Sequence, residues 1–399
     1  MSAIPRHDPT VRNVVLLAIC HALAMSASAM TITMAALAGH LLAEDKGMAT
    51  LPLAFQFLAT MVVTIPTSLL MERIGRRAGF SLGAVCGIAA GLIAARGIFI
   101  DDFALFCLGS ALFGVASAFA YFYRFAAADT ASEAFKSKAI SLVMAGGLVA
   151  AFLGPQLAVW TRELFAPVLF AGGYMAIAAL AGLALLILQF IAIPKPSVAV
   201  RRNAGRPLLE IIRQRKFLVA VLAAITGYGG MNIVMTATPL AMMACNHPFE
   251  SAALVIQWHA VGMFAPAFFT GHLIQRFGCE RIIAIGGLLI LGCVGVNLSG
   301  VAVWQFWLAL FLLGIGWSFM FIGGTTLLTE VYRTEERAKI QGLNDLLVFG
   351  SVAVTAWSSG QIFDALGWQA VNLSLLLPVV LALGLALWLG RRRALAPLS

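Results

Sequence analysis

The amino-acid sequence predicts an all-α membrane protein with twelve transmembrane helices, and three observations support that fold class. Hydrophobic residues make up 61% of the 399 residues and charged residues only 11%, whereas about a quarter of the residues are charged in a typical soluble protein. The mean hydropathy is correspondingly high, at +0.95. Apolar runs long enough to cross a bilayer recur along the whole chain. These runs lie near residues 13–41, 48–71, 79–99, 103–128, 137–160, 165–193, 217–243, 251–275, 282–300, 303–329, 338–362 and 369–390.

The loop charges predict the orientation of these helices. An even number of spans puts both termini on one side, and that side carries basic clusters such as residues 73–77 and 391–393. The opposite side holds only Lys46, Arg96 and Arg162. Since cytoplasmic loops are enriched in Lys and Arg, both termini are expected in the cytoplasm. The net charge of +9 therefore reflects membrane topology, and no nucleic-acid partner is expected.

A polar segment divides the chain into two halves of six spans. We expect an N-terminal six-helix bundle over residues 1–193, a cytoplasmic linker over 194–216 and a C-terminal six-helix bundle over 217–399. Residues 68–77, after the second span, have a counterpart in residues 271–278, after the eighth. Such parallel repeats of six spans are the organisation of one large class of transporters.

The segment 68–79 resembles the signature loop G-x-L-x-D-R-x-G-R-R of the major facilitator superfamily, with Ser68 in place of the first glycine and Glu72 in place of the aspartate. The resemblance, together with the 6+6 layout, covers the whole chain and implies a transporter of that fold. It also implies a cytoplasmic gate in which Glu72, Arg73 and Arg77 pair with groups such as Asp129. The alternative is that these arginines are ordinary anchors on the cytoplasmic side.

Signatures of enzymes are absent from the sequence: it has no nucleophile elbow, no HExxH and no phosphate-binding glycine loop. The six cysteines have no paired spacing, so a disulfide framework is not expected. A proton-coupled drug exporter is disfavoured because the central thirds of the runs contain no Asp or Glu. Asp345, early in the eleventh span, is a candidate proton or gating site, or else a helix-end residue.

Methionine and histidine carry the remaining chemical signal. Met231 and Met235 lie one turn apart on the seventh span, and His259 and Met263 lie one turn apart on the eighth. If the two helices are antiparallel neighbours, the four side chains form a set of soft metal ligands near mid-membrane, and such ligands suit Cu(I). The alternative for His259 is an imidazole bonded to a neighbouring helix.

More soft side chains lie in the first span and near the outer ends of the seventh and eighth. They could form a secondary path for a metal ion, although a chance grouping explains the outer set nearly as well. These residues are His21, Met25, Met242, Met243, Cys245 and His247.

The paired motifs M-x-x-x-M and H-x-x-x-M resemble those of CcoA-type copper importers, which are bacterial inner-membrane members of the superfamily. The resemblance implies import of copper into the cytoplasm by alternating access, with copper as substrate, no prosthetic group and a possible cytoplasmic copper acceptor. The same subfamily includes RfnT-like riboflavin importers, so riboflavin or another small organic solute is the alternative cargo. If riboflavin is the cargo, Tyr121, Tyr123 or Tyr228 could stack on its flavin ring. A monomer is expected.

Overall fold

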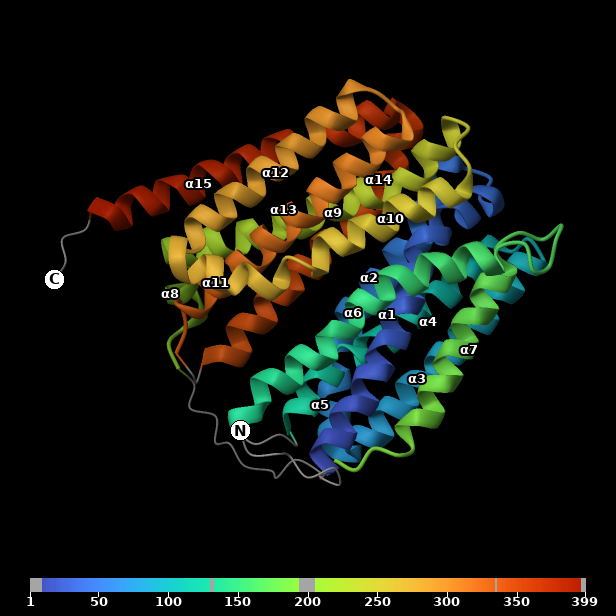
Figure 1. Ribbon diagram of the computed structural model, residues 1–399, viewed down its shortest axis with the longest axis horizontal. Coiled ribbons are helices and arrows are strands. Elements are labelled where there is room, and N and C mark those ends of the chain that lie inside the picture. The colour runs from blue at the N-terminus through green and yellow to red at the C-terminus, as the bar shows by residue number, and fades with distance from the viewer. Residues whose placement is uncertain (1–8, 130–132, 194–204, 334–335, 396–399) are drawn as a thin grey trace. The chain divides into compact units, whose positions relative to one another are not determined.

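The computed structural model describes residues 9–129, 133–193, 205–333 and 336–395, and it divides the chain into two compact units, Met1–Val198 and Ala199–Ser399. Within the described residues of the first unit the regular elements are helices (Figure 1). They are α1 (Pro9–Leu42), the 3₁₀ helix η1 (Lys46–Thr50), α2 (Leu51–Ile74), α3 (Arg76–Phe99), α4 (Phe103–Ala120), α5 (Tyr123–Asp129), α6 (Glu133–Thr161) and α7 (Ala171–Leu188).

The second unit has the same character where it is described. Its helices are α8 (Leu208–Ile212), α9 (Arg215–Ala244), α10 (Phe249–Phe264), α11 (Ala267–Phe277), α12 (Cys279–Ser299), α13 (Val303–Thr329), α14 (Arg337–Leu373) and α15 (Leu376–Leu395). In this unit α13 packs against α9, α10 and α12, while α14 packs against α9 and α15 packs against α12. Helix α13 is therefore the central helix of the unit.

The described helices account for the twelve expected crossings. Ten stretches are long and apolar enough to cross a membrane, and the pair Phe249–Phe264 and Ala267–Phe277, bent by 41°, makes an eleventh. One of the ten stretches, Lys339–Arg391, has 53 residues, whereas about 20 residues suffice for one crossing. It contains nearly all of α14, which is kinked where Gly367 has a φ of 79°, and most of α15, so it has the length of two crossings.

Two of the spans are each formed by two helices with a short interruption between them. The span formed by α4 and α5 breaks at Tyr121 and Phe122. The eighth span breaks at Pro266, because proline has no N–H to continue the helical ladder.

A buried ion pair holds the start of the second unit against the loop between α13 and α14. The guanidinium of Arg206 donates from Nε to Oε1 and from Nη2 to Oε2 of Glu336, at 2.8 Å each. The backbone N–H of Arg206 donates to the same carboxylate, as does that of Arg333. The side chain of Glu336 is fully buried, and these donors hold its pKa well below its ordinary value.

We expect Glu336→Gln to lower the melting temperature of the detergent-solubilised protein by a few degrees at pH 7. The pKa of Glu336 is lowered on folding, so the ion pair stabilises the protein above the ordinary value of about 4.5 and is lost as the pH falls further. The difference between wild type and variant should therefore stay constant from pH 7 to about 5 and shrink below that. Glu250→Gln, at an exposed residue, is the control; an equal loss in both variants would contradict this account.

Candidate functional site

Five aromatic rings from four helices of the second unit come together and form what we call the aromatic platform. The platform consists of Tyr228 of α9, Phe264 of α10, Trp317 and Phe321 of α13, and Phe349 of α14. Tyr228 lies 5.4 Å from Trp317 and from Phe321, and 6.0 Å from Phe349, measured between ring centroids. Phe264 lies 6.4 Å from Trp317.

The platform is centred on α13. Trp317 and Phe321 are one turn apart on this helix, and their rings are stacked with centroids 5.2 Å apart and planes 9° from parallel. On α9, Gly227 faces Met320 of α13, whereas Gly229 faces Ser351 and Thr355 of α14. Tyr228 lies between these two faces and is directed between α13 and α14.

The platform offers both ring faces and a polar donor. Tyr228, Phe264, Phe321 and Phe349 are half-buried, so part of each ring remains accessible. Trp317 is 8% exposed, and its Nε1 is buried without a hydrogen-bond partner. Buried polar groups are normally paired, so an unpaired indole N–H next to accessible rings is a feature expected of a ligand site.

The structure places the predicted metal quartet inside helix packing. Met231 and Met235 of α9 are 1% and 4% exposed, and Met263 of α10 is half-buried. His259 is 1% exposed, and its Nδ1 lies 2.8 Å from the carbonyl oxygen of Leu310 on α13. Helix α13 is thus the main packing partner of α10. The imidazole of His259 is bonded to this neighbouring helix, as the alternative to a metal ligand predicted.

The residues of the predicted secondary path lie in separate surroundings. His247 Nε2 is 2.7 Å from the carbonyl oxygen of Val301, Met242 is fully buried and Met243 is 38% exposed. Cys245 is half-buried and ends α9. In the part of the chain that the structure describes, no group of three or more His, Cys, Asp or Glu side chains could hold a metal ion.

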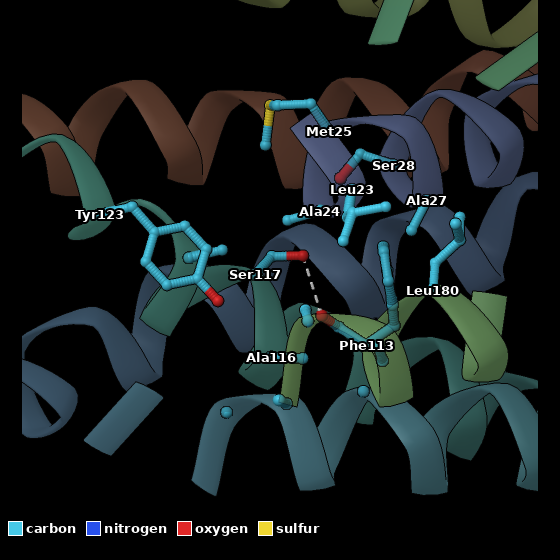
Figure 2. A pocket seen from close by; sticks show the side chains of 16 residues that line it. Leu23, Ala24, Met25, Ala27, Ser28, Phe113, Ala116, Ser117, Tyr123 and Leu180 are labelled. Carbon is cyan, nitrogen blue, oxygen red and sulfur yellow. Dashed lines mark hydrogen bonds between the residues drawn. The ribbon is translucent and has the colours of Figure 1, made fainter. Parts of the chain in front are cut away.

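In the first unit His21 is buried, and Met25, one turn later, lines a small pocket (Figure 2). Figure 2 shows Tyr123 reaching into the same pocket, near Ser117, whose hydroxyl donates to the carbonyl oxygen of Phe113 at 2.9 Å. The pocket has a volume of about 40 Å³, whereas sites for small organic ligands have roughly 300 Å³ or more. It has room for water and not for an organic substrate.

Of the predicted gate residues, Glu72 and Arg73 lie at the end of α2 and Arg77 lies at the start of α3. Glu72 and Arg73 are exposed, and no described side chain forms an ion pair with either. Arg77 donates from Nη2 to Oε1 of Gln189 at 3.2 Å. The side chain of Asp129 lies outside the described part of the structure.

Asp345 is exposed on α14, two turns after the helix begins. It accepts a hydrogen bond from Asn344 Nδ2 at 3.2 Å.

Comparison with protein families decides the classification. The family model described as Major Facilitator Superfamily matches residues 15–343 and 250–398. The chain belongs to the Major Facilitator Superfamily. Among solved structures of the superfamily fold, the crystal structure of a point mutant of the nucleoside transporter NupG matches 94% of this chain and 99% of its own, with a TM-score of 0.72 and 13% identity. The family match indicates a transporter.

Curated members of the superfamily are similar over most of the chain. The riboflavin transporter RfnT of Brucella anthropi is 44% identical over 375 residues, which are 92% of this chain and 93% of RfnT. The uncharacterized transporter YdeG of Bacillus subtilis is 28% identical over 88% of this chain and 86% of its own.

The prediction of copper import is wrong. The similarity to a riboflavin transporter extends over nearly the whole chain, and it supports the alternative cargo, riboflavin, instead of copper. The paired methionine and histidine motifs therefore do not determine the substrate. The physical reason is that the spacing of residues along two helices shows which side chains share a face of each helix. It does not show which neighbouring helix that face packs against. Here α13 takes the imidazole of His259.

Sequence reasoning named Tyr228 as a possible stacking residue but missed the other four rings of the platform. A signal was present for two of them, since Trp317 and Phe321 share a helix face at a spacing of four residues. The sequence gave no such signal for Phe264 and Phe349, because isolated phenylalanines are common in membrane helices. Tyr123 is a core residue, 4% exposed, with its ring 4.7 Å from that of Phe80.

Proposed function

We propose that this chain imports riboflavin across a bacterial cytoplasmic membrane by alternating access. The observation that carries the proposal is 44% identity to a riboflavin transporter over 92% of the chain. Both termini are proposed to be cytoplasmic, on the basis of the loop charges. The predicted halves, residues 1–193 and 217–399, are proposed to move as the two gating bodies, joined by the linker 194–216.

The aromatic platform supports this cargo. Riboflavin has a flat three-ring isoalloxazine system, and stacking a planar heterocycle on an aromatic side chain is worth about 1–3 kcal/mol. The accessible rings of Tyr228 and Phe321 offer such a surface. The free indole N–H of Trp317 adds a donor for a ring nitrogen or carbonyl oxygen.

The residues predicted to bind copper have another role in this proposal. Met235 lies on nearly the same face of α9 as Tyr228, at a separation of seven residues, and Met231 lies between them. Thioethers make favourable contacts with aromatic rings and adapt to irregular shapes. We propose that Met231 and Met235 pack around the platform, and that His259 and Met263 fix α10 against α13.

The cytoplasmic gate also remains a proposal. Glu72, Arg73, Arg77 and Asp129 would pair when the cytoplasmic side closes and separate when it opens. Asp345, exposed near the start of α14, is proposed to bind a coupling proton or to take part in the same gate.

The experiment is uptake of radiolabelled riboflavin by a riboflavin-auxotrophic bacterium with and without this chain. We expect uptake to appear only with the chain and to be unchanged by a membrane-permeant Cu(I) chelator. Met231→Leu, which removes the thioether but keeps the volume, should retain most of the activity. Uptake no higher than in cells with an empty vector, at a verified level of membrane protein, would reject the proposed function.

A further inference from the structure

A pocket separate from the aromatic platform lies in the second unit, where α12 ends and α14 is kinked. Its lining residues lie within 297–301, at the end of α12 and in the turn after it, and within 366–369, around the kink. The pocket has a volume of about 360 Å³, which falls within the range of sites for small organic ligands. Trp317 of the platform lies about 20 Å along α13 from the start of that helix, so the pocket is a second cavity.

Asn297 is the buried amide of the pocket wall. Its side chain is 3% exposed, and its Nδ2 donates to Oδ1 of Asn372 at 2.7 Å. Asn372 in turn donates from its own Nδ2 to the carbonyl oxygen of Trp368 at 2.9 Å. None of the residues that the structure describes donates to Oδ1 of Asn297. The wall therefore holds an amide in a fixed orientation with an acceptor to spare.

Trp368 supplies an unpaired donor in the same wall. It is 9% exposed, its ring lies 5.3 Å from that of Phe306 on α13, and its Nε1 is buried without a hydrogen-bond partner. Buried polar groups are normally paired. An unpaired indole N–H and a spare amide acceptor in the wall of one cavity therefore point to a ligand that both donates and accepts hydrogen bonds.

The turn that forms one side of the pocket is held in place by neighbouring side chains. The carbonyl oxygen of Val301 lies 2.7 Å from Nε2 of His247. Gln305 accepts from the backbone N–H of Ala302 at 2.8 Å and donates from Nε2 to the hydroxyl of Ser299 at 3.0 Å. A wall that is ordered before binding reduces the entropic cost of taking up a ligand.

The charges near the pocket limit the class of ligand. The turns at this end of the unit, residues 245–250, 299–302 and 364–375, contain Glu250 and Asp364 but no Lys or Arg. An anionic ligand would therefore lack a counter-charge and would be repelled. Hydroxyl groups are uncharged and act as donor and acceptor at once, so a hydroxylated chain matches the wall.

Resting on the proposed function and on the orientation that the loop charges indicate, we propose that this pocket is an outer binding site for the ribityl chain of riboflavin. Its hydroxyl groups donate to Oδ1 of Asn297 and accept from Nε1 of Trp368. The exposed amide of Gln369, which also lines the pocket, adds a further donor and acceptor. A free sugar alcohol offers the same hydroxyl groups, and the experiment separates it from the cargo.

The test measures competition with radiolabelled riboflavin uptake by unlabelled riboflavin, by ribitol and by lumiflavin, in which a methyl group replaces the ribityl chain. In the wild type, lumiflavin should compete at least about tenfold less well than riboflavin, because a site built around hydrogen bonds rejects an analogue that lacks them. Ribitol should compete at least about a hundredfold less well, because it lacks the ring.

Asn297→Leu and Trp368→Phe each remove one hydrogen bond and should raise the KM for riboflavin about three- to tenfold. The kcat should stay within about twofold, since it follows the conformational change and not the first binding step. The double variant should discriminate against lumiflavin less than about threefold. Gln369→Ala changes an exposed residue, so it should raise the KM about threefold even if the buried substitutions lower the amount of membrane protein.

The matched control is Trp304→Phe. Trp304 is an exposed indole near the start of α13 and does not line the pocket. This variant makes the same chemical change as Trp368→Phe at the same end of the unit. It should keep the wild-type KM and the wild-type discrimination.

Three outcomes overturn the inference and leave the proposed function intact. The first is equal competition by riboflavin and lumiflavin in the wild type, which needs no variant. The second is a KM in the pocket variants that equals that of Trp304→Phe. The third is competition by ribitol as strong as by riboflavin, which would indicate a site for sugar alcohols. Absence of riboflavin uptake by the wild type rejects the proposed function instead.

Discussion

Replacing Trp317 with alanine is expected to lower riboflavin uptake at least about tenfold while leaving the amount of protein in the membrane nearly unchanged. Trp317 contacts Tyr228, Phe264 and Phe321, so its removal takes away the centre of the aromatic platform and the free indole donor together. Loss of one stacking contact of about 1–3 kcal/mol predicts roughly a five- to hundredfold change, and the loss of the hydrogen bond adds to it. The measurement is the initial rate of labelled riboflavin uptake.

A matched control is available on the same helix. Trp304, near the start of α13, is 60% exposed, and Trp304→Ala should keep at least half of the wild-type uptake. Trp317→Phe should retain more activity than Trp317→Ala, because it keeps a ring face and loses only the donor. Equal uptake by Trp317→Ala and wild type would contradict a role of the platform in substrate binding.

Substituting Gly314 with valine is expected to destabilise the second unit by about 3 kcal/mol and to lower its yield severely. Helices α10 and α13 cross at this glycine, where a Cβ would lie 2.5 Å from the carbonyl oxygen of His259 and 2.9 Å from the backbone nitrogen of Met263. Both are backbone atoms that cannot move aside, so the helices must separate. The separation would also break the contact between His259 Nδ1 and the carbonyl oxygen of Leu310.

The measurement is the melting temperature and the monodisperse yield after solubilisation in detergent. Gly384→Val is the control, since Gly384 is an exposed helical glycine of α15, and a Cβ added there would meet no atom within 4 Å. The control should behave like the wild type. If Gly314→Val melts at the same temperature as Gly384→Val, the close crossing of α10 and α13 does not hold this unit together.

The fold could be predicted from the sequence because its causes are local. A bilayer requires about 20 apolar residues per crossing, and loop charge sets orientation, so composition and spacing were enough to predict the crossings. The expected superfamily is confirmed by the family model, which matches nearly the whole chain. The bend at Pro266 and the change of direction near Gly367 are both located at residue types that permit them.

The candidate site could be predicted only in part. Tyr228 was recognised, but its partners come from other helices, and contacts between distant segments are not visible in the spacing along any one of them. The copper prediction failed for a related reason, since residue types that suit a metal also suit packing against a ring or a carbonyl group.

The most direct test of flavin transport is counterflow of labelled riboflavin in proteoliposomes that contain only this chain. Vesicles loaded with unlabelled riboflavin should accumulate the label transiently above the level of protein-free vesicles, and vesicles with Trp317→Ala should accumulate at least about tenfold less. A label content equal to that of protein-free vesicles, with correctly inserted protein, would contradict riboflavin as the substrate.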